Sequence, residues 1–373
     1  MLKFRLYPNA EQRQILERAL EDCRYIYNEL LAIHKITYKE TGKTMSQYDM
    51  NLKLKQLKCG NLALSQVHSQ VLQNISKRIR DAYHNFFTRR KLGLNAGLPR
   101  FKKYGRYKSI TYPQSGFRVE GKKLWLSKIG YINIKLHRPI RGAVKTLTVK
   151  RISSGKWFAT FSCKILLKPE EKIGSAVGID VGLRHFLTDT DGRQIENPNF
   201  YQKALNRIRI ENKKLSKKKR GSKNRMKQRV RLAKAYEKIT NQRDDFLHKL
   251  SKIYTQHYGL IVIEDLKITN MVKNHNLAQK ILDASWGRFL QMLSYKAEGA
   301  GGMVLKVNPR NTSRIYKHGK LDRDYNASLN ILERGLTGQG LPLGPVDIEP
   351  LREPKQIPAN SVVEAGSPLL VGW

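Results

Sequence analysis

Short runs in which apolar and polar residues alternate predict β-strands in the first half of the chain. Leu2-Lys3-Phe4-Arg5-Leu6 alternates in this way until Pro8 and Asn9 end the run. Similar runs recur between glycine-containing turns at 122–126, 132–136, 144–152 and 156–166. They predict a small antiparallel barrel or sheet, which the strand at residues 2–7 joins.

Apolar residues at helical spacing predict two long helices between these strands. One follows Asn9, and its apolar face consists of Ile15, Leu16, Ala19, Leu20, Cys23, Tyr27, Leu30 and Leu31. The other runs from about Ser65 to Arg90, with the apolar stripe Val67, Val71, Ile75, Ile79, Ala82 and Phe86. The polar stretch between them, residues 35–60, is expected to form helices joined by loops. Residues 10–95 are therefore expected to be a helical insertion into a β-domain.

Strand-like and helix-like segments alternate in the second half, which predicts an α/β fold. After a linker at 168–172, strands are expected at 177–182, 185–189, 260–264 and 303–307, with Asp191-Gly192 as a hairpin turn. Residues 199–257 should form an antiparallel helical hairpin broken at Gly221-Ser222. Further helices are expected at 277–298 and at 326–334, where Gly335 ends the last one. The Pro- and Gly-rich residues 336–373 are expected to be a largely disordered tail.

Acidic residues interrupt three segments of this α/β pattern. Asp180 lies within Val177-Gly178-Ile179-Asp180-Val181-Gly182-Leu183, Glu264 ends a second apolar strand, and Asp322 and Asp324 precede the last helix. A buried carboxylate needs hydrogen bonds or a cation. Mg²⁺ prefers oxygen ligands, and two ions roughly 3.5–4 Å apart can act on one phosphodiester. The acids therefore predict a two-metal nuclease site, in which Asp180 bridges the ions and Glu264 and Asp324 each complete one.

Each acid also has a purely structural interpretation when it is taken singly. Asp180 could pair with a lysine, and Glu264 could be an edge residue. Asp322 or Asp324 could be only a helix N-cap. The nuclease interpretation depends on the joint occurrence of the acids, in this order and on these elements.

The charge of the chain indicates what it binds. Lys and Arg number 71 against 30 acidic residues, so the formal charge is +41. Such an excess opposes compact folding unless a polyanion neutralises it, and nucleic acid is the expected polyanion, with an acidic membrane surface as the alternative. No run of about 18 apolar residues predicts a membrane span, and no signal peptide is visible. The isolated Cys23, Cys59 and Cys163 fit a reducing cytosol and exclude a CxxC-type zinc site.

Three basic or polar surfaces are candidates for nucleic-acid contacts. The helix at 65–90 presents Ser69, Gln70, Gln73, Asn74 and Lys77, whose side chains suit base edges and phosphates. The segment 97–114 interleaves Arg100, Lys102, Lys103 and Arg106 with Phe101, Tyr104, Tyr107 and Tyr112, a composition that combines charge with stacking surface. Residues 213–231 include Lys217, Lys218, Arg220 and Arg225. Solvated faces and core-anchoring aromatics are the alternatives.

Several motifs in this order resemble the TnpB family, transposon proteins long labelled transposases, and the compact type V CRISPR nucleases related to it. They are KFRLYPNAEQ, RYIYNELL, GLPRFKKY, VGIDVGLRHFLTD, RDDFLHKLS, IVIEDLKITNMVKN, DASWGRFLQMLSYKAE, VNPRNTS and DRDYNASLNI. The resemblance implies a wedge-type β-barrel (residues 1–8 and 98–168) carrying an inserted helical recognition domain (9–97). It also implies an RNase H-like RuvC nuclease domain (169–335) split by a helical hairpin, followed by the tail 336–373.

The resemblance also implies function. Its members use a transposon-end guide RNA and cut double-stranded DNA beside a short transposon-adjacent motif. The catalytic, Mg²⁺-binding triad falls on Asp180, Glu264 and Asp324, and the duplex-reading helix on residues 65–74. A monomer within the ribonucleoprotein, in a bacterial or archaeal cytoplasm at the nucleoid, is expected.

One departure from the family concerns zinc. Members usually carry a four-cysteine zinc knuckle between the TS and DRD motifs, but residues 314–321 contain no cysteine, so zinc is not expected. The loop that carries Asp324 is then less well fixed, and cleavage could be slow or restricted to one strand. Arg314, Lys317 and Lys320 are expected to compensate through phosphate contacts.

Two further functions remain open from the sequence. An RNA-guided protein that binds DNA without cutting it would act as a repressor, although such a protein is expected to lose at least one acid. A strand-transfer transposase would use the same carboxylate chemistry.

Overall fold

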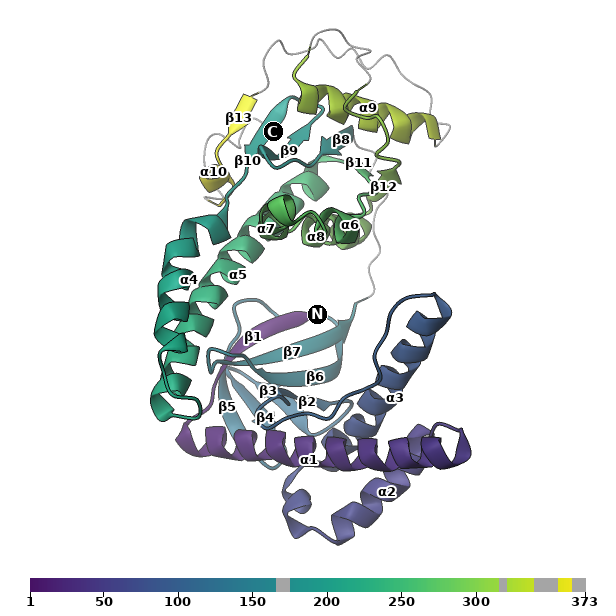
Figure 1. Ribbon diagram of the computed structural model, residues 1–373, viewed down its shortest axis with the longest axis vertical. Coiled ribbons are helices and arrows are strands. Elements are labelled where there is room, and N and C mark those ends of the chain that lie inside the picture. The colour runs from purple at the N-terminus through teal and green to yellow at the C-terminus, as the bar shows by residue number, and fades with distance from the viewer. Residues whose placement is uncertain (166–174, 315–320, 339–354, 364–373) are drawn as a thin grey trace. The chain divides into compact units, whose positions relative to one another are not determined.

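The computed structural model describes residues 1–165, 175–314, 321–338 and 355–363 (Figure 1). The chain divides into two compact units, Met1–Leu166 and Leu167–Trp373. Each unit has its own hydrophobic core. The predicted linker at 168–172 lies outside the described residues. No helix in the described part of the chain is long and apolar enough to cross a membrane.

The first unit is built on a seven-stranded antiparallel sheet of order β2-β6-β7-β1-β5-β4-β3. The strands are β1 (Leu2–Tyr7), β2 (Ser109–Tyr112), β3 (Phe117–Glu120), β4 (Lys123–Leu126), β5 (Gly130–Lys135), β6 (Ala143–Arg151) and β7 (Trp157–Lys164). Its edge strands β2 and β3 are joined by only residues 113–116, so the sheet must curl until its edges approach each other. The rings of Tyr112 and Phe117 lie 6.3 Å apart across this junction. The predicted antiparallel sheet is therefore confirmed, with a nearly closed, barrel-like form and with β1 in its middle.

Helices are inserted between β1 and β2, as predicted. They are α1 (Ala10–Thr41), α2 (Gln47–Cys59), the 3₁₀ helix η1 (Leu62–Gln66) and α3 (Ser69–Lys91). A capping box between Asn9 and Gln12 starts α1, whose predicted apolar face is buried except for the half-buried Ile15. The helix expected from Ser65 begins only at Ser69, because Val67 and His68 have extended backbones. Near its end the buried side of this helix contains Tyr83, so the predicted stripe residues Ala82 and Phe86 are only half-buried.

The second unit contains a six-stranded sheet of order β12-β11-β8-β9-β10-β13. The strands are β8 (Ala176–Asp180), β9 (His185–Asp189), β10 (Arg193–Glu196), β11 (Leu260–Glu264), β12 (Met303–Val307) and β13 (Lys355–Ile357). Strands β8, β11 and β12 run parallel, whereas β8, β9 and β10 form an antiparallel meander. The strands predicted at 260–264 and 303–307 are confirmed residue for residue.

Helices cover both faces of this sheet (Figure 1). The helices of this unit are α4 (Phe200–Ser216), α5 (Lys223–His257), α6 (Ile268–Met271), α7 (His275–Ala284), α8 (Trp286–Gly299), α9 (Arg323–Gly338) and α10 (Ala359–Val363). Val177, Ile179, Ile261 and Ile263 face the core formed with α5 and α8. Val262 packs on the opposite side against Ile331 and Leu332 of α9. Burial on both faces explains why β8 and β11 are almost continuously apolar.

Ser222 supports the predicted break between the two helices of the basic hairpin. Its hydroxyl accepts a hydrogen bond from the backbone N–H of Arg225 at 3.1 Å and caps the start of α5. Helices α4 and α5 contact each other along the hairpin. The predicted antiparallel helical hairpin is therefore confirmed.

The single helix predicted at 277–298 is wrong, because Ser285 has a left-handed backbone (φ 58°) and separates α7 from α8. Both Ala284 and Trp286 are buried. Residues two positions apart on one continuous helix point about 200° apart around its axis, so these side chains could not share one buried face. The break resolves this conflict.

The predicted helix stop at Gly335 is also wrong, because α9 continues through it to Gly338. A Cβ atom at position 335 would lie 2.5 Å from Cγ2 of Val262. Gly335 therefore serves the close approach of α9 to β11 and does not end the helix.

The disordered tail is wrong for part of the segment 336–373. Residues 336–338 belong to α9, and β13 pairs in parallel with the edge strand β10. Ile357, Ala359 and Val362 are buried in the core of the second unit. Residues 339–354 and 364–373 lie outside the described residues. Strand β13, which sixteen residues separate from the end of α9, thus closes one edge of the sheet.

Replacing Ile357 with alanine is expected to loosen this edge. The substitution removes a buried side chain and should lower the free energy of unfolding by about 2–4 kcal/mol. Hydrogen exchange should become faster in β10, because its edge amides lose a stably bound partner strand. Gln356→Ala changes an exposed neighbour on the same strand and should leave both measurements unchanged. Equal exchange in the two variants would show that Ile357 does not anchor β13.

Candidate functional site

The register of β8 against β11 brings the first two predicted acids together. Ile179 pairs with Ile263 in this parallel ladder, so Asp180 and Glu264 follow as the next neighbouring positions. Adjacent strands are about 4.8 Å apart, and paired positions point to the same face of a sheet. Asp180 and Glu264 therefore lie side by side at the carboxyl ends of the two strands.

Helix α9 covers this same face and contributes the third acid. Gly178, two residues before Asp180, touches the helix so closely that a Cβ atom there would overlap the carbonyl oxygen of Ser328 and lie 2.8 Å from the backbone N of Leu332. The first turn of α9 carries Asp324. Its Oδ2 lies 3.9 Å from the position that a Cβ of Gly182 would take, just beyond the end of β8.

The raised pKa of Asp180 indicates that the three acids lie close together. Its pKa is raised to about 7, first by burial and then by the negative charges of Glu264 and Asp324, while Arg323 and the backbone N–H of Val181 oppose the rise. Like charges shift a pKa in this way only at short range. The acids thus form one interacting cluster.

Glu264 is held by a residue that sequence reasoning missed. The Thr312 hydroxyl donates to Glu264 Oε1 at 2.5 Å, and the Thr312 carbonyl accepts from Asn330 Nδ2 at 2.8 Å. Burial raises the pKa of Glu264, and this hydrogen bond and Arg334 oppose the rise. Thr312 lies in the VNPRNTS motif, but only its packing against β11 reveals its partner.

The N-cap alternative is correct for Asp322. Its Oδ1 accepts hydrogen bonds from the backbone N–H groups of Asp324 and Tyr325, both at 3.1 Å, and from Gln194 Nε2 at 2.9 Å. Asp322 therefore starts α9. Its capping role fixes the first turn and, with it, the position of Asp324.

His185 is a second neighbour that sequence reasoning missed. It lies on β9, is buried, and places Nδ1 3.9 Å from Asp324 Oδ2. His185 lies in the VGIDVGLRHFLTD motif, but the strand pattern did not indicate that its imidazole faces the acids.

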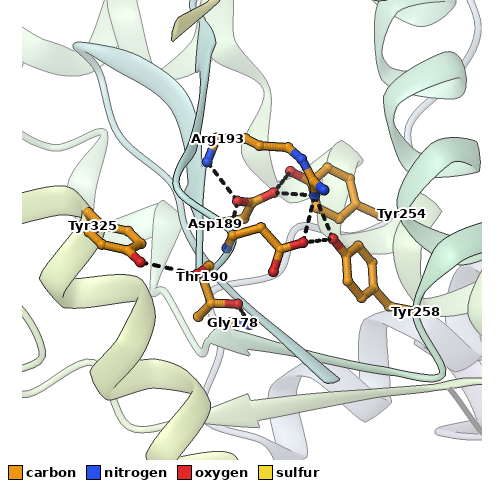
Figure 2. A network of polar contacts seen from close by, with 8 residues as sticks. Gly178, Asp189, Thr190, Arg193, Tyr254, Tyr258 and Tyr325 are labelled. Carbon is orange, nitrogen blue, oxygen red and sulfur yellow. Dashed lines mark hydrogen bonds and ion pairs between the residues drawn. The ribbon is translucent and has the colours of Figure 1, made fainter. Parts of the chain in front are cut away.

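A buried polar network beside the cluster ties its supporting strands to α5 (Figure 2). Asp189, at the end of β9, accepts hydrogen bonds from the Tyr254 hydroxyl at 2.8 Å and from Arg193 at 3.3 Å. Arg193 also donates to the Tyr258 hydroxyl and pairs with Asp191 at 2.9 Å. Burial raises the pKa of Asp189 to about 6, and Arg193 opposes the rise. The β9–β10 hairpin is thereby fixed to the C-terminal end of α5.

The same network reaches α9 through Thr190. Its hydroxyl accepts from the backbone N–H of Gly178 at 3.3 Å, and its carbonyl oxygen from the Tyr325 hydroxyl at 3.5 Å (Figure 2). The elements that carry Asp180 and Asp324 are thus linked through one residue.

The donor set fits divalent cations shared between several ligands. All three acids supply the hard oxygen atoms that Mg²⁺ prefers, and Asp180 is destabilised as an anion until positive charge arrives. Among the described residues, no three His, Cys, Asp or Glu side chains stand close enough to hold one ion between them.

The predicted contacts on α3 divide into two rows. Ser69, Gln73 and Lys77 are exposed and four residues apart, so they form one stripe. Gln70 and Asn74 are half-buried and already accept hydrogen bonds, from the backbone N–H of Ser115 at 3.1 Å and from Arg78 Nε at 2.9 Å. The exposed stripe is therefore the better candidate for nucleic-acid contacts.

The two basic segments differ in how much of their charge is free. Arg100, Lys102, Lys103 and Arg106 are exposed in the loop before β2, as are Lys217, Lys218 and Arg220 after α4. Arg225 instead donates to the carbonyl oxygens of Leu215 and Lys218, both at 2.8 Å. It therefore caps the end of α4, and its assignment as a phosphate contact stays a prediction.

The segment proposed to replace a zinc knuckle is only partly described. Lys317 and Lys320 lie outside the described residues, and Arg314 is exposed. The sequence has no cysteine after Cys163, so thiolate ligands for zinc are lacking throughout the second unit.

Three family models match this chain. The model described as "Probable transposase" matches residues 147–275, "Cas12f1-like, TNB domain" matches 286–331, and "Helix-turn-helix domain" matches 1–43. In the structure, residues 1–43 contain strand β1 and one continuous helix, α1.

Relatives and a solved structure extend the match over most of the chain. A Streptomyces pristinaespiralis protein named "Putative RNA-guided DNA endonuclease" is 31% identical over 96% of this chain and 94% of its own length. The Escherichia coli K12 protein "Putative RNA-guided DNA endonuclease InsQ" is 32% identical over 84% of this chain and 81% of its own. The mimivirus "TnpB-like protein L79" is 23% identical over 90% and 73%.

Among solved structures, a Cas12f1–sgRNA–target DNA complex matches with a TM-score of 0.52 at 17% identity, covering 87% of this chain and 83% of that chain. This similarity shows a compact Cas12-like fold. Together with relatives about a third identical over four fifths or more of their own length, it shows that the chain belongs to the TnpB family.

Proposed function

We propose that the protein is an RNA-guided DNA endonuclease of a transposable element and that its second unit is an RNase H-like, RuvC-type nuclease domain. The observation that carries the proposal is the convergence of Asp180, Glu264 and Asp324, from the ends of β8 and β11 and the first turn of α9, where the other two acids raise the pKa of Asp180. Support also comes from the names of the relatives and from the antiparallel meander β8-β9-β10 followed by parallel β11 and β12.

Each residue of the cluster has a proposed role in phosphodiester hydrolysis. Asp180, whose pKa both other acids raise, would contact both Mg²⁺ ions, with Glu264 holding one and Asp324 the other. When bound, two such ions supply Lewis-acid stabilisation of the attacking and leaving oxygens. Thr312 keeps the Glu264 carboxylate in one orientation, and Asp322 keeps Asp324 at the start of α9.

The proposed partners are a guide RNA from the transposon end and double-stranded target DNA beside a short transposon-adjacent motif. The charge of +41 supports a polyanionic partner. The exposed stripe Ser69, Gln73 and Lys77 on α3 is the proposed contact with the adjacent motif. We propose a monomer in the ribonucleoprotein, in the cytoplasm at the nucleoid.

Strand transfer is a second candidate, because one matching family model is described as a transposase. A transposase would join donor ends to target DNA, whereas a guided nuclease needs only a cut in the target. An RNA-guided repressor without cleavage is disfavoured because all three acids are present and interacting.

The experiment is a plasmid-cleavage assay on the ribonucleoprotein purified with its own RNA. The proposal expects cutting at sites complementary to that RNA, dependent on Mg²⁺ and abolished by chelation with EDTA. Binding of the matched plasmid without cutting would favour the repressor, and joined donor–target products would favour the transposase.

A further inference from the structure

The loop from residue 98 to 108, the second part of the connection between α3 and β2, has no helix or strand but is fixed along α1. Asn28 binds the backbone of Lys102 twice, since its Oδ1 accepts from Lys102 N at 2.8 Å and its Nδ2 donates to Lys102 O at 3.0 Å. Glu21 Oε1 accepts from the backbone N–H of Gly105 at 3.0 Å. Two points three residues apart on the loop's path are thus anchored to one long helix.

Between these anchors the chain makes a tight turn with Tyr104 at its tip. The backbone N–H of Arg106 donates to the carbonyl oxygen of Lys103 at 3.0 Å, and Gly105 has φ +68°. A left-handed residue at this position suits glycine. Tyr104 is 82% exposed, more than any other aromatic residue in the described part of the chain. The ring is therefore presented to solvent on a backbone that cannot easily relax.

Two other aromatic residues near the turn, Phe101 and Tyr27, contact lysine side chains. Lys35 Nζ lies 4.5 Å from the centre of the Phe101 ring, and Lys102 Nζ lies 5.5 Å from that of Tyr27. These cation–π contacts hold the loop against α1. Tyr104 has no such role, so the stability of the loop does not account for it.

The charges beside Tyr104 are free to bind a polyanion. Lys103 and Arg106 are exposed, and within the described residues neither forms an ion pair with an acid. The nearby carboxylate of Glu21 is already engaged by Arg24 Nε at 2.6 Å and by Gly105. An exposed ring between two unneutralised cations combines a stacking surface with phosphate contacts.

We propose that Tyr104 is a stacking platform for an unpaired nucleobase, with Lys103 and Arg106 on the phosphates to either side of that nucleotide. The inference rests on the proposed function, because it assigns a binding site for the nucleic acid on the first unit. The chemistry is that of a single-stranded segment, which either the guide RNA or an opened DNA strand could supply.

Affinity and its salt dependence separate stacking from charge. The full-length protein, freed of nucleic acid at high salt, is titrated with fluorescein-labelled oligouridine in metal-free buffer. Tyr104→Ala should weaken binding about 5- to 150-fold without changing the slope of log K against log salt. Lys103→Ala should instead reduce that slope by about 0.7. Tyr104→Phe, which keeps the ring, should bind as the wild type does.

Tyr48→Ala is the matched control, because Tyr48 on α2 is 70% exposed and has no part in the loop. An abasic oligonucleotide should bind wild type and Tyr104→Ala equally. Ultraviolet crosslinking of the intact ribonucleoprotein, with and without target DNA, followed by mass spectrometry should give an adduct on Tyr104. A ribose or a deoxyribose in the adduct identifies the strand.

Equal affinities of Tyr104→Ala and Tyr48→Ala, with no adduct on Tyr104, would overturn the proposal even if the protein cuts DNA. Failure of cleavage would leave these binding results unaffected, so the two hypotheses fail separately.

Discussion

Replacing Asp180 with asparagine is expected to reduce DNA cleavage at least about 10³-fold while leaving RNA binding within about twofold. Asparagine keeps the size of the side chain but removes the charge that both proposed ions share. Asp265→Asn is the matched control, because Asp265 follows Glu264 directly and pairs with Lys267 at 2.6 Å. Plasmid cleavage and filter binding of the co-purified RNA measure the two effects. Normal cutting by Asp180→Asn would refute the metal assignment.

The same substitution is expected to stabilise the metal-free protein, although it abolishes most of the cleavage. Asp180 has a pKa of about 7 in the folded chain against 3.8 in the unfolded chain. Between these values the native state binds more protons than the unfolded state, so stability falls as pH rises from about 4 to 7 and stays lower above. Asp180→Asn removes this loss, and at pH 8 it should be more stable than wild type by about 1–3 kcal/mol.

Urea unfolding in EDTA at pH 5 and pH 8 measures this difference, which should shrink at the lower pH. Adding Mg²⁺ at pH 8 should stabilise the wild type and not the variant, because the ion neutralises the repulsion among the acids. Identical pH dependence of the two proteins would mean that ionisation of Asp180 does not destabilise the folded state.

Gly178→Ala is expected to lower cleavage about 100-fold, although residue 178 touches no substrate. Its Cβ would overlap the Ser328 carbonyl oxygen and press on Leu332, so α9 must shift on the sheet. A displacement of about an ångström at a catalytic group can cost this much. Overpacking should also lower the free energy of unfolding by about 1–3 kcal/mol.

Gly338→Ala is the control on α9 itself, because no atom of the described residues lies within 4 Å of a Cβ there. It should leave cleavage unchanged and stability equal or slightly higher. If Gly178→Ala cleaved like this control, α9 would not be fixed against β8, and the position of Asp324 would need another explanation.

Local pattern was sufficient to predict most of the elements. The apolar runs at 260–264 and 303–307 predicted strands, and Gly221-Ser222 marked the hairpin between α4 and α5. The family motifs indicated the order of the three acids along the chain. The register of β8 against β11 explains why Asp180 and Glu264 become neighbours.

Contacts between distant segments could not be predicted in this way. The bond between Thr312 and Glu264 joins residues 48 apart, and β13 is too short to form without the β10 edge. Gly335 resembles a helix stop until Val262 is seen against it, and Arg225 resembles a free cation until its carbonyl partners are seen. In each case tertiary packing outweighs the local preference.

Anomalous diffraction from crystals soaked in Mn²⁺ would test the central claim most directly. Mn²⁺ accepts the same oxygen ligands as Mg²⁺. The account predicts peaks within coordination distance, roughly 2.2 Å, of the carboxylates of Asp180, Glu264 and Asp324, with Asp180 contacting each ion. Carboxylates that stay free of metal, with the ions bound elsewhere, would contradict it.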